Sequence, residues 1–150
     1  MAVWLAVLGL AYLVASHFLQ PKPVVITANG DLVIPKSRNG HFYAMGTVNG
    51  KPARFLVDTG ATLVVVRREF AAEAKLTGGV PTSFTTANGK IEGRIVHGVP
   101  VSVGPVSVSG VTVGWGMVGN DANDALLGQS FLQKFDVLLS KDQMVLRQHY

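Results

Sequence analysis

A single aspartate stands between two apolar runs of this chain, and this placement limits the folds that the chain can adopt. Asp58 follows the apolar residues 55–57 (Phe-Leu-Val) and precedes the segment 59–62 (Thr-Gly-Ala-Thr) and a second apolar run, 63–66 (Leu-Val-Val-Val). Carboxylates are rarely buried, because an ionised carboxylate that loses its hydration must be paired or neutralised. Short apolar runs bounded by turn residues are typical of buried strands. We therefore predict two strands joined by a tight turn, with the Asp58 carboxylate at the base of a site.

The composition favours one β-rich domain. A chain of 150 residues can bury one substantial core, and its 17 glycines and 7 prolines are typical of strands joined by tight turns. Cysteine is absent, which excludes disulfides, thiolate catalysis and cysteine-ligated zinc. The four histidines have no metal-ligand spacing, so we predict neither a metal nor a cofactor. The basic residues are scattered, which favours a solvated surface over a nucleic-acid-binding face.

The N-terminal segment is almost entirely apolar. Residues 2–19 are interrupted only by Tyr12, Ser16 and His17. A helix that spans a membrane needs about 20 apolar residues, whereas a signal peptide has a basic start and an apolar region of about 7–15 residues. No basic residue precedes this run and no clear cleavage site follows it. We therefore predict an uncleaved transmembrane anchor at residues 1–20, with a cleaved signal peptide as the alternative.

The remainder of the chain divides into a linker and a folded domain. Residues 21–37 contain three prolines and an Asn-Gly pair, which predicts a linker with one β-hairpin. The domain at residues 38–150 shows mostly strand patterns, and a bulge is predicted at Gly110 in one of them. Helices are predicted at residues 67–76 and 129–135, and a polar loop at residues 120–125.

The Asp-Thr-Gly sequence occurs only once, although the chemistry that it could support needs two carboxylates. Peptide hydrolysis without a metal or a covalent nucleophile requires a general base and a general acid. Two carboxylates that share one proton supply both, and a two-fold homodimer would bring Asp58 and its symmetry mate together. Thr59 would donate a hydrogen bond across the axis, and Gly60 would allow a tight turn. Ala61 would leave space for substrate, and Thr62 would hydrogen-bond the outer side of the carboxylate.

The segment 55–62 resembles the active-site segment of the retropepsin-like aspartic proteases. Two further elements of that family follow in the expected order and at compatible spacing. The apolar pair and glycine that pack behind the catalytic loop correspond to Leu126, Leu127 and Gly128. The tip of the flap hairpin corresponds to Ala87, Asn88, Gly89 and Lys90. Residues 38–148 are most similar to a bacterial, membrane-anchored, single-domain subfamily of clan AA, from which Gln129 departs because methionine is expected there.

This resemblance implies a mainly β fold, a closed retropepsin-like (acid protease) β-barrel with one short C-terminal helix, preceded by the N-terminal transmembrane helix. It also implies a homodimer in which Asp58 of each subunit is catalytic and activates water for peptide-bond hydrolysis. The polypeptide substrate would bind as an extended strand between flap and floor, with Val64 and Val65 near its side chains. The subfamily suggests a bacterial inner membrane and a periplasmic domain, whereas the basic residues after the anchor favour the cytoplasmic side.

Two other functions are compatible with the same sequence. The first is a non-catalytic β-barrel adaptor that binds extended peptides or only dimerises, because a fold can persist without its activity. The second is a protease that acts mainly on itself and removes its own anchor by cleavage within residues 18–38.

Overall fold

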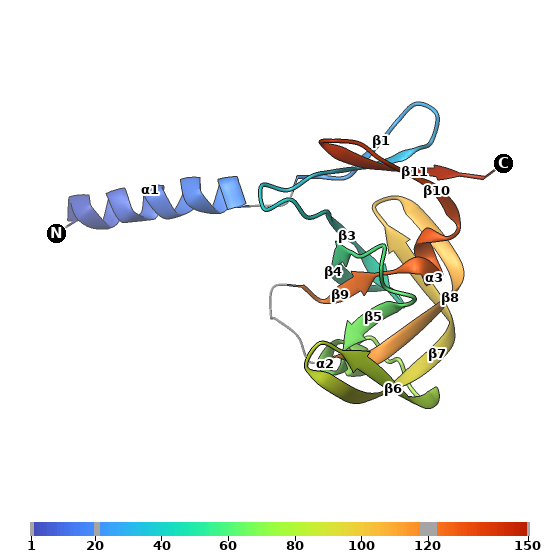
Figure 1. The fold of residues 1–150 in the computed structure, drawn as a ribbon. Coiled ribbons are helices and arrows are strands. Elements are labelled where there is room, and N and C mark those ends of the chain that lie inside the picture. Colours follow the sequence, from blue (N-terminus) through green and yellow to red (C-terminus); the bar gives the residue numbers. More distant parts are fainter. Residues whose placement is uncertain (1, 20–21, 118–122, 150) are drawn as a thin grey trace.

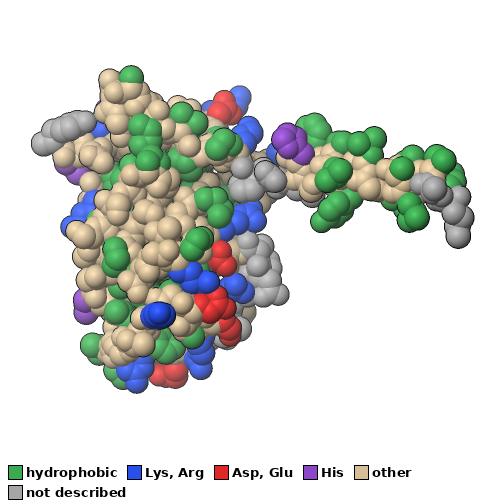
Figure 2. All heavy atoms as spheres, turned by 180° about the vertical axis from the view of Figure 1, so that it is seen from behind, with side chains coloured by type: hydrophobic (Ala, Val, Ile, Leu, Met, Phe, Trp, Pro, Cys, Tyr) green, Lys and Arg blue, Asp and Glu red, His purple; other side chains and the backbone are tan. Residues whose placement is uncertain are grey.

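The computed structural model describes residues 2–19, 22–117 and 123–149. Within these residues it contains three helices and eleven strands. The helix α1 (Ala2–Leu19) lies outside a β domain formed by the other elements (Figure 1). Figure 2 shows apolar side chains along this helix, whereas the charged side chains gather on the β domain.

The prediction of a transmembrane helix is wrong. No helix in the described ranges is both long enough and apolar enough to cross a membrane. The transmembrane helix of the predicted fold is therefore corrected, and the predicted membrane anchoring is not supported.

Four strands from the two ends of the β domain form an antiparallel sheet. In spatial order they are β1 (Val25–Ile26), β2 (Leu32–Pro35), β11 (Gln143–Gln148) and β10 (Phe135–Leu139). The segment 21–37, predicted as a linker with one β-hairpin, contains the hairpin β1–β2 and also contributes β2 to this sheet. Leu32 and Ile34 are fully buried there. An ion pair of 3.3 Å between Arg147 Nε and Asp31 Oδ2 joins the same two parts of the chain.

The other strands form a seven-stranded sheet that closes on itself. Their order is β3 (Tyr43–Val48), β4 (Lys51–Val57), β9 (Ala125–Leu127), β5 (Val64–Arg67), β8 (Val106–Met117), β7 (Gly89–Val103) and β6 (Val80–Thr86). Because β3 also pairs with β7, six strands close into a barrel and β6 remains at the edge. A Cβ on Gly46 would lie 1.9 Å from the carbonyl oxygen of Ser102, so this closure requires glycine. The mainly β, closed barrel is confirmed.

The long hairpin of β7 and β8 contains the predicted bulge. Val99 pairs with Val111 and Val101 pairs with Val108, so β8 uses three steps where β7 uses two. The extra residue lies beside Gly110, whose φ of 76° favours glycine. All of these valines except Val108 are buried, and together they fill the centre of the barrel.

The two helices of the β domain are shorter than predicted. The helix α2 (Arg68–Glu73) ends early because Lys75 has a φ of 56°, which is incompatible with a continuing helix. Phe70 and Ala74 are nevertheless buried. The helix α3 (Gln129–Leu132) forms a single turn with its apolar side chains in the core. Part of the predicted polar loop, residues 120–122, lies outside the described residues.

Candidate active site

Asp58 lies directly after β4, at the start of the turn that leads to β5. The strand β9 inserts between these two strands, with Leu127 paired to Val57 and Leu126 paired to Val65. The N–H of Asp58 donates a hydrogen bond of 3.1 Å to the carbonyl of Leu127. Two elements that are far apart in the sequence therefore meet at one point of the barrel.

The turn holds the Asp58 carboxylate in one orientation. The N–H of Gly60 donates to Asp58 Oδ1 at 2.9 Å, and the N–H of Ala61 donates to the Asp58 carbonyl at 3.2 Å. A Cβ on Gly60 would stand only 3.3 Å from Oδ1, which is a tight contact. Asp58 is half-buried, whereas Thr59 and Gly60 are exposed. The carboxylate therefore sits at a surface of the single chain.

The start of α3 supports this turn from behind. The backbone N–H of Gln129 donates to the carbonyl of Ala61 at 2.8 Å, and its side-chain Nε2 donates to the carbonyl of Thr59 at 2.8 Å. The chain can approach so closely only because residue 128 is glycine: a Cβ on Gly128 would lie 2.1 Å from the carbonyl oxygen of Leu63. Gln129, which the sequence marked only as a departure from the subfamily, is thus a direct contact of the turn.

Ser130 links the same turn to two strands. Its backbone N–H donates to the carbonyl of Thr62 at 3.0 Å. Its buried hydroxyl accepts the N–H of Val64 at 2.8 Å and donates to the carbonyl of Thr112 at 2.7 Å. Thr62 contributes its carbonyl to this arrangement, and no hydrogen bond joins its hydroxyl to the Asp58 carboxylate among the described residues.

The strands β6 and β7 form the hairpin that was predicted as a flap. Its turn is closed by Thr86, whose Oγ1 accepts the N–H of Asn88 at 3.3 Å and donates to the carbonyl of Gly89 at 2.8 Å. The four residues predicted at the tip, Ala87 to Lys90, are all exposed. Among the described strands β6 pairs with β7 alone, so the outer edge of this hairpin has no strand partner there.

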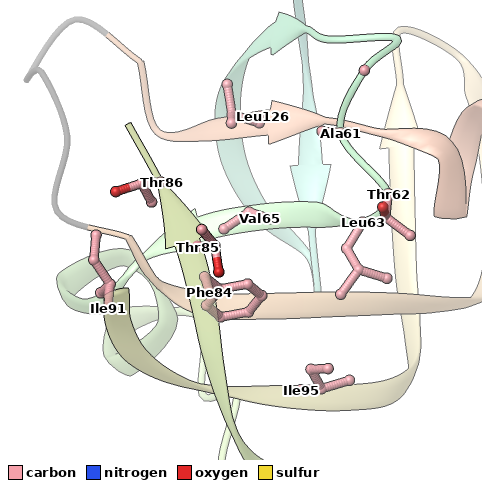
Figure 3. Close-up of a pocket in the computed structure, with 11 residues that line it drawn as sticks. Ala61, Thr62, Leu63, Val65, Phe84, Thr85, Thr86, Ile91, Ile95 and Leu126 are labelled. Atoms are coloured by element: carbon pink, nitrogen blue, oxygen red, sulfur yellow. The ribbon is translucent and has the colours of Figure 1, made fainter. Parts of the chain in front are cut away.

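A cavity of about 570 Å³ separates this hairpin from the turn after Asp58 (Figure 3). Gly60, Ala61 and Thr62 line it on one side, and Thr85 and Thr86 line it from the hairpin. The remaining lining is apolar and consists of Leu63, Val65, Phe84, Ile91, Ile95 and Leu126.

Sequence reasoning found this lining only in part. Val65 contributes to the cavity, but its neighbour Val64 is fully buried on the opposite face of β5. Phe84, Ile91 and Ile95 were not predicted. The alternation of β6 and β7 carries a usable signal, because Phe84 and Ile91 are cross-strand partners and share one face of the hairpin.

The chemistry available to one chain is half of an acid–base pair. An oriented carboxylate at a surface can activate water as a general base. Protonation of the leaving group needs a second proton donor, and two carboxyl groups held close together can share one proton for that purpose. The exposed turn at Thr59 and Gly60 leaves room for a second copy of the same carboxylate.

Comparisons with known proteins agree with this geometry. Residues 44–134 match the model of a family described as "gag-polyprotein putative aspartyl protease". The chain is also similar to the crystal structure of a retropepsin-like aspartic protease from Rickettsia conorii. The TM-score is 0.65 at 30% sequence identity, over 78% of this chain and 89% of that chain.

Curated relatives share sequence over most of the domain. An uncharacterized protein in the cobV 5′ region of Sinorhizobium sp is 32% identical over 124 residues, and uncharacterized protein RP867 of Rickettsia prowazekii is 29% identical over 133 residues. These matches cover 78% and 80% of this chain but 52% of each relative, so the chain spans about half their length. DNA damage-inducible protein 1 of Yarrowia lipolytica is 30% identical over 107 residues, which are 65% of this chain and 25% of that protein.

Proposed function

Because the chain belongs to the family of retropepsin-like aspartic proteases, we propose that it is an aspartic endopeptidase that cleaves polypeptides as a homodimer. The observation that carries the proposal is the position of Asp58. Its carboxylate is oriented by the N–H of Gly60, is braced from behind by α3, and stands next to an apolar cavity beneath a hairpin.

The second carboxylate would come from a second copy of the chain. A two-fold axis beside the exposed Thr59 and Gly60 brings the two Asp58 side chains together, because every contact in such an interface occurs twice. Like charges at about 3 Å cannot both ionise, so the pair holds one proton. Neither chain can then act alone, and the active site exists only in the dimer.

The reaction follows from that shared proton. The ionised carboxylate takes a proton from a water molecule, whose oxygen attacks the carbonyl carbon of the peptide bond, while the protonated carboxyl gives its proton to the carbonyl oxygen. The carbon–nitrogen bond then breaks, and a proton passes to the leaving amine. The products are a carboxyl terminus and an amino terminus, so all atoms of the water are accounted for.

The free edge of the hairpin suits an extended substrate. A polypeptide can add as a strand next to β6, where main-chain hydrogen bonds supply affinity for any sequence. Every second side chain of such a strand points to the same face, so some of them would enter the apolar cavity.

The experiment compares the wild-type chain with Asp58→Asn, using Asp142→Asn as the matched control. Asp142 is exposed in the turn between β10 and β11, so the same chemical change there should leave activity unaltered. We expect Asp58→Asn to keep the wild-type circular dichroism and thermal transition, and to lose peptide hydrolysis by a factor of about 10³ or more. A variant that cuts peptides at the wild-type rate would refute the assignment.

Mixing the two chains tests the homodimer. Mixed dimers contain one carboxyl and one amide, so adding Asp58→Asn to a fixed amount of wild type should lower hydrolysis as the subunits exchange. Asp142→Asn added in the same amount should not lower it. If added Asp58→Asn does not lower hydrolysis, one chain suffices for activity. A total absence of hydrolysis would favour the adaptor function instead.

A further inference from the structure

Two glycines of neighbouring strands, Gly93 and Gly114, lie against the side chain of Phe84. A Cβ on Gly93 of β7 would lie 2.7 Å from Phe84 Cε2, and a Cβ on Gly114 of β8 would lie 2.7 Å from Phe84 Cζ. Real Cβ atoms essentially never come closer than 3.0 Å to such neighbours. The ring of Phe84 therefore rests directly on main-chain atoms at both positions.

The same ring forms part of the cavity wall. Phe84 belongs to β6, and β7 lies between β6 and β8 in the sheet, so its side chain crosses β7 to reach Gly114 on β8. Figure 3 shows the ring among the lining side chains, between Leu63 and Ile91. An aromatic ring that covers glycines of neighbouring strands is a known means of holding strands in register. Here the ring also sets how far the cavity extends toward the sheet.

We propose that Phe84 is a specificity-determining residue, whose ring, seated on Gly93 and Gly114, forms the floor of a pocket for one large apolar side chain of the substrate. This inference rests on the proposed function, because it names the substrate class of that site. The pocket's apolar walls favour aliphatic and aromatic groups, and a charged side chain would lose its hydration there. A single methylene in such a pocket changes discrimination by about 10- to 200-fold.

Substitutions at the floor should change the pocket in opposite directions. Gly114→Ala places a methyl group under the ring and raises it into the cavity, which makes the pocket shallower. Phe84→Leu replaces the ring by a smaller side chain, which makes the pocket deeper. Gly114 has no positive φ, so alanine is compatible with its backbone. Gly93 is unsuitable for the test, because a Cβ there would also lie 2.1 Å from the carbonyl oxygen of Trp115.

The experiment uses peptide sets in which each position in turn carries alanine, valine, leucine, phenylalanine or aspartate. For each variant, kcat/KM is measured for every peptide. At one position, we expect Gly114→Ala to lower the phenylalanine-to-alanine ratio by about 10-fold or more, and Phe84→Leu to raise it. The double variant should recover the wild-type ratio within about 3-fold, because the added methyl group then fills the space that the ring left.

Ser83→Ala is the matched control, because Ser83 is the exposed neighbour of Phe84 on β6 and does not line the cavity. It should leave every ratio unchanged. If Gly114→Ala does not fold, Phe84→Leu alone tests whether the ring determines specificity. Unchanged ratios at all positions in Phe84→Leu would overturn the proposal while leaving the proposed protease activity intact.

Binding separates this proposal from the proposed function. The same peptides, carrying a fluorescent label, are titrated with Asp58→Asn and with Asp58→Asn combined with each floor substitution, and anisotropy is recorded. If wild type cleaves nothing but the preference in binding follows the floor substitutions, the pocket stands and the protease function fails. If no peptide binds or is cleaved, both are overturned.

Discussion

A methyl group on residue 128 tests how closely α3 must approach the turn after Asp58. An ideal Cβ on Gly128 would lie 2.1 Å from the carbonyl oxygen of Leu63 and 2.7 Å from that of Ala61. Ordinary contact begins at 3.4 Å, so the two backbones must separate by about 1.3 Å to admit it. Both oxygens are main-chain carbonyl oxygens, so neither can move without moving the backbone of the turn or of Leu63, the residue after it.

That separation disrupts the hydrogen bonds that join α3 to the turn. The N–H of Gln129 lies 2.8 Å from its acceptor and the N–H of Ser130 lies 3.0 Å from its own. Each such bond contributes about 1 kcal/mol net, and overpacking adds roughly 1–3 kcal/mol. We therefore expect Gly128→Ala to lower the free energy of unfolding by about 3–5 kcal/mol.

Urea denaturation measures this change, provided that the m-value stays constant. Gly9→Ala is the control, because a Cβ at Gly9 meets no atom within 4 Å and the residue lies inside α1. Alanine there should be neutral for the β domain and favourable for the helix by up to about 1 kcal/mol. If Gly128→Ala unfolds within about 1 kcal/mol of wild type, the close approach does not hold the turn in the way argued.

Two further substitutions separate activity from stability at the same place. Gln129→Met removes the donor to the Thr59 carbonyl and should lower kcat about 5-fold, the equivalent of about 1 kcal/mol, with little change in Tm. The control Gln133→Met, at an exposed residue, should change neither kcat nor Tm. Equal kcat values for the two variants would show that the bond does not position the turn. Ser130→Ala leaves two backbone groups without their partner and should lower the free energy of unfolding, measured by urea denaturation, by about 2 kcal/mol. Ser140→Ala loses one exposed local hydrogen bond and should lower it by less than about 0.5 kcal/mol. A cost at Ser130 no larger than at Ser140 would contradict the buried bridge.

Local patterns predicted much of the barrel. Strand patterns in the sequence predicted this part of the fold, and Gly110 was predicted as the bulge site that lies in β8. The turn at Asn88 and Gly89 is typical of an Asn-Gly pair, and Gly89 has a φ of 112°. That Asp58 meets the Leu126–Gly128 segment could be expected only from the resemblance, because the contact joins distant parts of the chain.

Features that depend on distant partners were missed or misjudged. Residues 32–35 are all apolar, but a run of four residues is too short to distinguish a linker hairpin from a core strand, and their pairing with β11 decides it. The contact of the Phe84 ring with Gly93 and Gly114 depends on how three strands are aligned, and no single segment of the sequence contains that information. The prediction that residues 2–19 span a membrane rested on apolar content alone, and no described helix meets the requirements for such a span.

The arrangement of the strands separates folding from assembly. The centre of the four-stranded sheet forms within one chain, since β2 and β11 pair directly and their Leu32 and Leu146 side chains are fully buried. The barrel is likewise closed by β3 and β7 of the same chain. What the proposed machinery needs from a partner is the second carboxylate. A partner should therefore control the rate of hydrolysis per chain while adding little to the free energy of unfolding of the barrel. The change in hydrolysis on mixing wild type with Asp58→Asn then reports on catalysis and not on folding.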